Sequence, residues 1–166
     1  KAIPEFRDAV DRGVVLDLGH SGTDFRFREA RRLLDQGYQP DTISTDLNLF
    51  SIGGPVFSLA ETMTKVWALG IELPHVIAMA TINPARVIRR SDHLGRLAVG
   101  GVADVSVLRV VEGELALSDG HETVRTDRAL SPFGCVRAGT WIPSDAVPSF
   151  TTVGKTWGPP LDDSDW

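Results

Sequence analysis

Apolar positions along the first 90 residues alternate between short runs and helical stripes. Residues 14–18, VVLDL, form an apolar run interrupted only by Asp17, which predicts a strand covered on both faces in a parallel sheet. A second short strand is predicted in DTISTD, residues 41–46. Because helical segments separate the two strands, the order indicates parallel βα units.

Helical periodicity is strongest between Val56 and Gly70, where apolar side chains recur at three- and four-residue intervals. For the last helix of this half, Asn83 is expected to be the cap and Pro84 the first helical residue. The other predicted helices are about 4–12, an amphipathic segment from Phe27 that ends at Gly37, Leu73–Thr81, and Pro84–Arg90.

The pattern changes near residue 93, after which glycines punctuate the chain and a β-rich segment follows at 102–111. Further strands are predicted at Leu115–Leu117, Thr123–Arg125 and Pro132–Ile142. We therefore expect three parts: βα units over 1–92, a small antiparallel β unit over 93–143, and an extended tail over 144–166.

Composition narrows the class of protein. The 166 residues are 42% hydrophobic and 23% charged, which is typical of a soluble globular protein. A net charge of −5 argues against nucleic acid or an anionic membrane as the main partner. The single cysteine, Cys135, excludes an intrachain disulfide and a thiolate metal cage, and it favours a cytoplasmic location. No apolar run approaches the roughly 20 residues that span a bilayer, and the first ten residues lack a signal peptide's apolar core.

Both predicted strands end in polar side chains, His20 after the first and Asp46 after the second. In parallel βα folds, ligand sites lie at the carboxyl ends of the strands. A poorly solvated carboxylate at such a place needs a cation, a metal or donated hydrogen bonds. His20 and Asp46 are therefore candidate site residues.

Simpler structural roles stay open for both. Asp46 also fits a helix cap or a turn formed with Asn48, and His20 fits a loop histidine bonded to the backbone. The remaining histidines are His75, His93 and His121. They form neither an i, i+4 pair nor a His-x-His, so they indicate a metal site only weakly.

Five segments, in unbroken order over roughly residues 3–110, resemble the C-terminal part of amidohydrolase-superfamily enzymes. They are VVLDLGHSGTDFRF, PDTISTDLN, PVFSLAETMTKVWALGI, VIAMATINPARVI and GRLAVGGVADVSVL. The likeness is greatest to the amidohydrolase/deacetylase metallohydrolase branch, whose members are relatives of dihydroorotase. It implies an α/β fold class: the last βα units of a (β/α)8 TIM barrel, and strands of a small flanking β-sandwich.

The resemblance also implies roles for individual residues. Asp46 matches the eighth-strand aspartate, which binds metal and moves a proton from the attacking water to the leaving amine. His20 matches a seventh-strand motif on the substrate side, and Asn48 stands where the branch often has a histidine. Asp104 matches a structural position at the start of a strand.

The cofactor implied by the resemblance is one or two divalent metals, usually zinc. The His-x-His, the bridging lysine and the two further histidines of the family have no counterparts here, so most metal ligands are expected outside this chain. We therefore expect a C-terminal fragment whose partner is the N-terminal part of the same barrel. Alone it is expected to be inactive and to fold poorly, with a pairing edge exposed on the 14–18 strand.

The expected reaction is hydrolysis of an amide or cyclic amide bond in a small molecule, with an N-acyl amino acid as one candidate substrate. Three alternatives stay open: ester hydrolysis or deamination, a non-catalytic amidohydrolase-like binding or assembly subunit, and an unrelated doubly wound α/β binding domain. The last would need a Gly-rich phosphate loop, which GHSGTDF matches poorly. Homo-oligomer formation is left open by the sequence.

Overall fold

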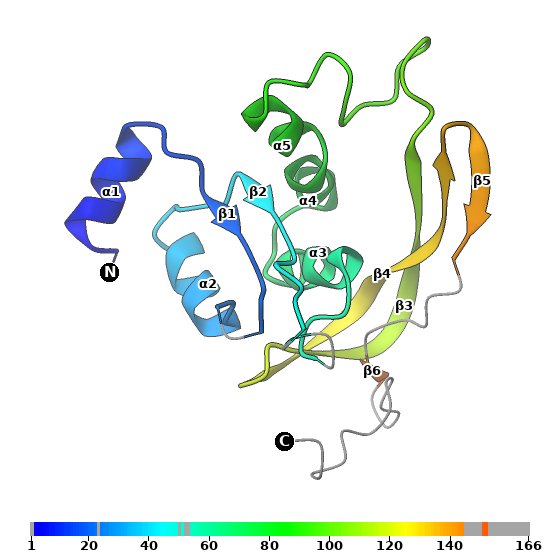
Figure 1. Ribbon diagram of the computed structural model, residues 1–166. Helices are drawn as coiled ribbons and strands as arrows, with labels where there is room; N and C mark the ends of the chain where they lie inside the picture. Colours follow the sequence, from blue (N-terminus) through cyan, green and yellow to red (C-terminus); the bar gives the residue numbers. More distant parts are fainter. Residues whose placement is uncertain (1, 23, 50, 52–53, 145–150, 153–166) are drawn as a thin grey trace.

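A computed structural model describes residues 2–22, 24–49, 51, 54–144 and 151–152 (Figure 1). Its first half contains two short parallel strands, β1 (Asp17–Leu18) and β2 (Thr42–Ile43), that pair in register. Helix α1 (Pro4–Asp11) precedes β1, and α2 (Phe27–Leu34) connects β1 to β2. The predicted order of helices and parallel strands is confirmed here.

Three further helices follow β2: α3 (Leu59–Ala68), α4 (Leu73–Ala80) and α5 (Ile82–Val87). In Figure 1, α3 lies between the β1–β2 pair and the second half of the chain, and α4 and α5 lie above α3 in this view. Every residue of α3 from Ala60 to Val66 is buried, so this helix is enclosed on all sides rather than presenting one face to solvent.

The second half forms one antiparallel sheet in the described part of the chain. Its strands are β3 (Val105–Ser118), β4 (Thr123–Arg137), β5 (Thr140–Pro143) and β6 (Thr151–Thr152), in the spatial order β5-β4-β3-β6. The short strands predicted at 115–117 and 123–125 are the ends of one long hairpin. The predicted 132–142 strand is instead broken at Ala138, which has a positive φ of 49°. The sandwich and the boundary near residue 93 stay predictions.

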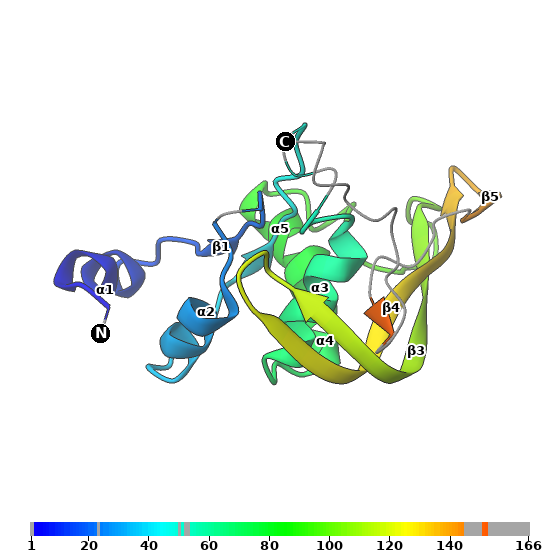
Figure 2. The same cartoon turned by 90° about the horizontal axis from the view of Figure 1, so that it is seen from below.

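The long hairpin curves beneath α3 and α4 and reaches toward α2, as the view from below shows (Figure 2). Two apolar clusters join it to the helices. One cluster unites Ile43 of β2 and Val66 of α3 with Leu130 of β4, and the other unites Phe27 of α2 with Leu115 of β3. The hairpin thus forms one wall of the core that supports the parallel strands.

The strand predicted at residues 14–18 is wrong in length and in burial. Only Asp17 and Leu18 pair with β2, and Val14 and Val15 are 49% and 45% exposed. The reason is that β1 has a single neighbour, β2, among the described residues, so nothing covers its other edge. This agrees with the expected exposed pairing edge.

The predicted start of the last helix is also wrong. α5 begins at Ile82, and Asn83 lies within it. Asn83 instead donates from Nδ2 to the Asp41 carbonyl, 2.8 Å away, which fixes the chain just before β2. Most of the predicted tail, residues 145–150 and 153–166, lies outside the described residues. Within the described ranges, no helix has the length and apolar character that crossing a membrane requires.

Candidate active site at the strand ends

Asp46 lies three residues beyond β2 and is exposed to solvent. Its backbone has a φ of 48°, a left-handed conformation that aspartate tolerates better than most residues. No hydrogen bond reaches its carboxylate from any residue that the structure describes, so it caps no helix there. The carboxylate is thus available to a ligand at the carboxyl end of the strand.

The turn after Asp46 is held by its neighbours. The Asn48 side-chain amide donates to the Asp46 carbonyl oxygen at 3.2 Å, as in the predicted turn. The Asn48 backbone N–H donates to Ser51 Oγ at 3.0 Å, which closes the next turn of the loop. Asn48 therefore braces the backbone beside Asp46, and its role toward substrate stays a prediction.

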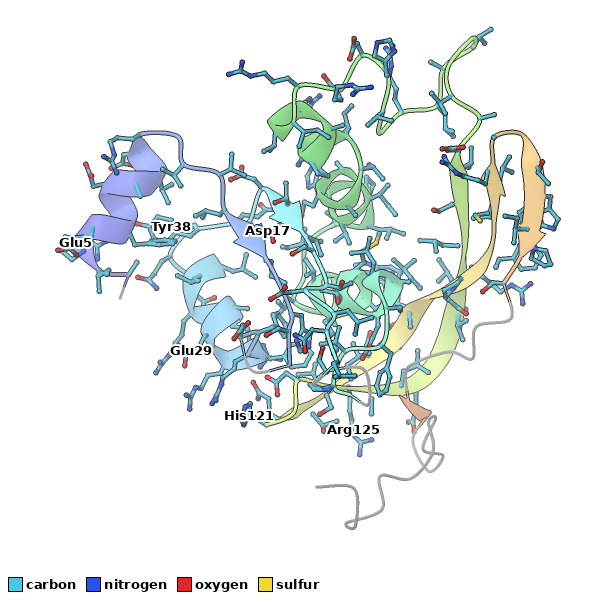
Figure 3. The ribbon with its side chains drawn as sticks, in the orientation of Figure 1. Glu5, Asp17, Glu29, Tyr38, His121 and Arg125 are labelled. Atoms are coloured by element: carbon cyan, nitrogen blue, oxygen red, sulfur yellow. The ribbon has the colours of Figure 1, made fainter. Side chains whose placement is uncertain are left out.

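β1 approaches Asp46 from the neighbouring strand. A Cβ placed on Gly19 would lie 3.7 Å from the Asp46 Cβ, so the backbone after β1 runs close against this side chain. Asp17, labelled in Figure 3 at the β1–β2 pair, accepts hydrogen bonds from the hydroxyls of Thr42 and Ser44. These bonds tie β1 to β2 at the strand ends that lead to Asp46.

His20 has a different environment from Asp46, because its side chain is completely buried. Its Nε2 lies 2.9 Å from Nζ of Lys65 on α3, and its ring packs against Phe25 with centroids 4.9 Å apart. Its Nδ1 has no hydrogen-bond partner among the described residues. The simpler expectation of a backbone-bonded loop histidine is wrong, since the partner is a buried lysine side chain.

Burial, together with the nearby positive charge of Lys65, lowers the pKa of His20 from its ordinary 6.5 to about 3. The carboxylates of Asp119 and Asp24 oppose this shift without reversing it. His20 is therefore neutral at physiological pH, a state in which it can accept a hydrogen bond on one nitrogen and donate from the other.

Lys65 is fully buried and forms an ion pair with Glu61 one helical turn earlier, with Nζ 3.0 Å from Oε1. Burial raises the pKa of Glu61 and lowers the pKa of Lys65, because both charged forms lose solvation, while their mutual attraction works in the opposite direction. Glu61 also accepts from the Phe57 backbone N–H at 2.8 Å, and Lys65 donates to the Pro55 carbonyl at 2.6 Å.

Asp119 is a third buried charged residue near this cluster. It lies in the turn between β3 and β4, where Oδ1 accepts from the N–H groups of His121 and Glu122, and Oδ2 accepts from Phe27 N–H at 2.8 Å. Burial alone would raise the pKa of Asp119, but these donors outweigh it and the pKa is lowered. The hairpin therefore supplies the N-terminal cap that Arg26, at the start of α2, does not provide.

Comparison with known proteins matches residues 26–139 to the amidohydrolase family. The chain belongs to the amidohydrolase family. A deacetylase of Brucella anthropi is 38% identical over 121 residues, which are 72% of this chain and 30% of that protein. A deacetylase of Agrobacterium fabrum is 39% identical over the same share of each chain.

Solved structures agree with this membership. The crystal structure of an adenine deaminase aligns with a TM-score of 0.81 at 29% identity, over 87% of this chain and 39% of that one. The structure of a dihydroorotase aligns with a TM-score of 0.75 at 34% identity, over 85% and 38%. The chain thus spans between 30% and 39% of the length of these amidohydrolase relatives.

The described part of this amidohydrolase chain contains no cluster of side chains that forms a metal site by itself. No group of three or more His, Cys, Asp or Glu side chains in the described ranges is arranged to bind an ion. Asp46 is one carboxylate, His20 has its Nε2 beside an ammonium group, and His75 and His93 lie on α4 and in the linker after α5. A metal centre would need ligands from elsewhere in the protein.

Sequence reasoning missed Glu61, Lys65 and Asp119. Glu61 and Lys65 are spaced i, i+4, which is also the spacing of an ordinary solvated pair, so their burial left no signal in the sequence. The Ser58-x-x-Glu61 capping pattern, which the sequence prediction did not use, could have placed Glu61 at the start of α3, where Ser58 Oγ accepts from Glu61 N–H at 3.1 Å. Asp119 belongs to a turn sequence, SDGHE, that indicates only a turn.

Proposed function

We propose that the protein containing this chain is a metal-dependent hydrolase of amide or cyclic amide bonds, similar to deacetylases and dihydroorotases. The supporting observation is the exposed Asp46 carboxylate, unbonded in the described part of the chain and set at the carboxyl end of β2, within a chain of the amidohydrolase family. Relatives named as deacetylases, an adenine deaminase and a dihydroorotase support chemistry at carbon–nitrogen bonds.

In this proposal β1 and β2 are the last two strands of a (β/α)8 barrel, and the sheet of the second half contributes to a flanking sandwich. One or two divalent ions, with zinc the first candidate, are bound by Asp46 and by ligands outside this chain. The uncovered edge of β1 supports a further strand at this place. The partner is thus the N-terminal part of the same protein, and the location is the cytoplasm.

Asp46 carries the proton in the proposed reaction. It accepts a proton from the attacking water and delivers it to the leaving nitrogen, which is a poor leaving group as an anion. His20 and Asn48 are proposed to face the substrate, a small amide. General acid–base catalysis of this kind contributes about 10²–10⁴-fold to rate.

The experiment uses the complete gene product that contains this chain, assayed for bound metal by elemental analysis and for hydrolysis of N-acyl amino acids, cyclic amides and adenine. Asp46→Asn keeps the size and the tolerance for a left-handed backbone, and we expect it to lose about 10²–10⁴-fold in kcat. The matched control is Asp35→Asn, an exposed carboxylate at the end of α2, which we expect to leave kcat unchanged.

The substrate panel also separates the alternatives. Release of ammonia from adenine would show that the reaction is deamination and not amide hydrolysis. A protein without metal and without hydrolysis of any member of the panel would contradict the proposal and favour a non-catalytic binding or assembly subunit.

A further inference from the structure

The ammonium group of Lys65 meets three acceptors inside the protein. Nζ lies 3.0 Å from Glu61 Oε1, 2.6 Å from the Pro55 carbonyl oxygen and 2.9 Å from His20 Nε2. An ammonium group has three hydrogens, so each of these contacts uses one of them. Because a donor already points at it, His20 Nε2 must accept, and the ring proton must be on Nδ1.

This assignment is the same whether the shared proton of the ion pair rests on Nζ or on Glu61 Oε1. If the proton moves to Glu61, Oε1–H donates to the Nζ lone pair, and the two remaining Nζ hydrogens still serve Pro55 and His20. Nζ could accept from a His20 Nε2–H only if its lone pair were free, that is, if Lys65 were neutral and Glu61 Oε1 carried no proton. The pair of Glu61 and Lys65 therefore selects the tautomer of His20.

The same contacts join the two loops that follow the parallel strands. His20 belongs to the loop after β1, and Pro55 belongs to the loop that begins at Asp46 after β2. Glu61 holds the end of that second loop through the Phe57 N–H. The loops also touch directly, since a Cβ placed on Gly22 would lie 3.6 Å from Pro55 Cδ. Helix α3 fixes both loops through one side chain.

We propose that Lys65 is a positioning residue, which holds His20 as the Nδ1–H tautomer and locks the strand-end loops around Asp46. This inference rests on the proposed function only for its effect on catalysis. The tautomer and the loop order are properties of the folded protein, and they can be measured whether or not the protein hydrolyses an amide.

The first experiment reads the tautomer in the complete gene product labelled with ¹⁵N-histidine. Two-bond ¹H–¹⁵N correlations distinguish a protonated ring nitrogen from an unprotonated one, and His20→Gln identifies the His20 signals by their absence. We expect Nδ1 to be protonated and Nε2 to be an acceptor. In Lys65→Met we expect the Nε2 resonance to move, because its donor is gone.

The second experiment measures loop order by amide hydrogen exchange. The Phe57 and Gly54 amides, which bond to Glu61 and to the Ser51 carbonyl, are expected to exchange faster in Lys65→Met. His20→Leu, which cannot accept a hydrogen bond, is expected to act in the same direction, whereas His20→Gln keeps an acceptor and should retain more protection. This pair remains informative if Lys65→Met does not fold.

The third experiment separates positioning from general stability. Thr64→Val is the matched control: Thr64 is also buried on α3, but its hydroxyl accepts from Leu130 N–H of β4 and not from a strand-end loop. With the best substrate of the panel, we expect Lys65→Met to lower kcat by about 10²-fold, as a misplaced catalytic group does, with a smaller change in KM. Thr64→Val should lower kcat much less.

A His20 ring protonated on Nε2 in the wild type, or a His20 spectrum unchanged by Lys65→Met, would overturn the inference. So would equal losses of kcat in Lys65→Met and Thr64→Val. If the protein binds no metal and hydrolyses nothing, the proposed function fails, while the tautomer and the exchange pattern still decide the role of Lys65.

Discussion

The ends of β1 and β2 carry a polar side chain each, yet the two side chains have opposite environments. His20 is buried, with one ring nitrogen against Lys65, whereas Asp46 is exposed, with a carboxylate that no described residue bonds. The difference comes from α3, which packs a charged pair behind the first strand end. Position at a strand end therefore marks a place where chemistry can occur, but the packing behind it decides whether the side chain is buried or open to solvent.

The largest expected effect on stability comes from breaking the buried Glu61–Lys65 pair, which makes the environments of the two strand ends different. Lys65→Met leaves Glu61 as an unpaired buried carboxyl group, and we expect it to lower the free energy of unfolding by about 3–5 kcal/mol. Adding Glu61→Gln to Lys65→Met removes the uncompensated charge, so the double variant should recover part of the loss. Urea unfolding of the complete gene product measures both; a double variant that is less stable than Lys65→Met would contradict this explanation.

A change of pH tests the same strand end without altering α3. The folded-state pKa of His20 is about 3, against an ordinary value of 6.5. Between these two pH values the unfolded chain therefore binds a proton on His20 that the folded protein does not bind. The stability contributed by neutral His20 is present above pH 6.5 and is lost as the pH falls toward 3, by at most about 1.4 kcal/mol per pH unit. The charged groups that act electrostatically on the ring are Lys65, Asp119 and Asp24.

The measurement compares wild type with His20→Gln by urea unfolding at pH 7 and at pH 5. We expect wild type to lose more stability between the two values, because the glutamine does not titrate. Equal losses would contradict the assignment of a depressed pKa to His20. All other histidines are present in both proteins and cancel in the comparison.

Removal of the Asp119 cap is expected to lower the free energy of unfolding by less than the loss of Lys65 does. Asp119 lies in the β3–β4 turn and caps α2, on the same side of the molecule as His20. Asp119→Ala removes the acceptor of three backbone N–H groups, and we expect a loss of about 1–3 kcal/mol, with faster amide exchange at Phe27. Because the pKa of Asp119 is lowered, this contribution is present above its ordinary pKa of 3.8 and is lost as the pH falls below it.

The control for the cap is Asp127→Ala, whose side chain is 87% exposed in the middle of the hairpin. A surface substitution of this kind is expected to change stability by less than about 0.5 kcal/mol. Similar losses for Asp119→Ala and Asp127→Ala would show that the cap contributes little.

Local sequence patterns predicted much of the fold, but they predicted the candidate site only in part. Helix α3 was predictable because its apolar spacing repeats within a few residues. The length of β3 and β4 was not, because pairing across the hairpin extends strands that look short when each is taken alone. Asp46 could be named from its place after a strand, but the partner of His20 is 45 residues away, and no local rule connects the two.

The smallest expected effect on stability is at the exposed strand end, where function and stability should separate. Asp46 has a left-handed backbone, which costs an ordinary residue about 1–2 kcal/mol, and glycine adopts it freely at an entropic cost of about 0.5–1 kcal/mol. The free energy of unfolding of Asp46→Gly should therefore lie within about 1 kcal/mol of the wild-type value. Its loss of hydrolysis should be as complete as that of Asp46→Asn. A large loss of stability in Asp46→Gly would show that the carboxylate holds the loop, and the contrast between the two strand ends would then disappear.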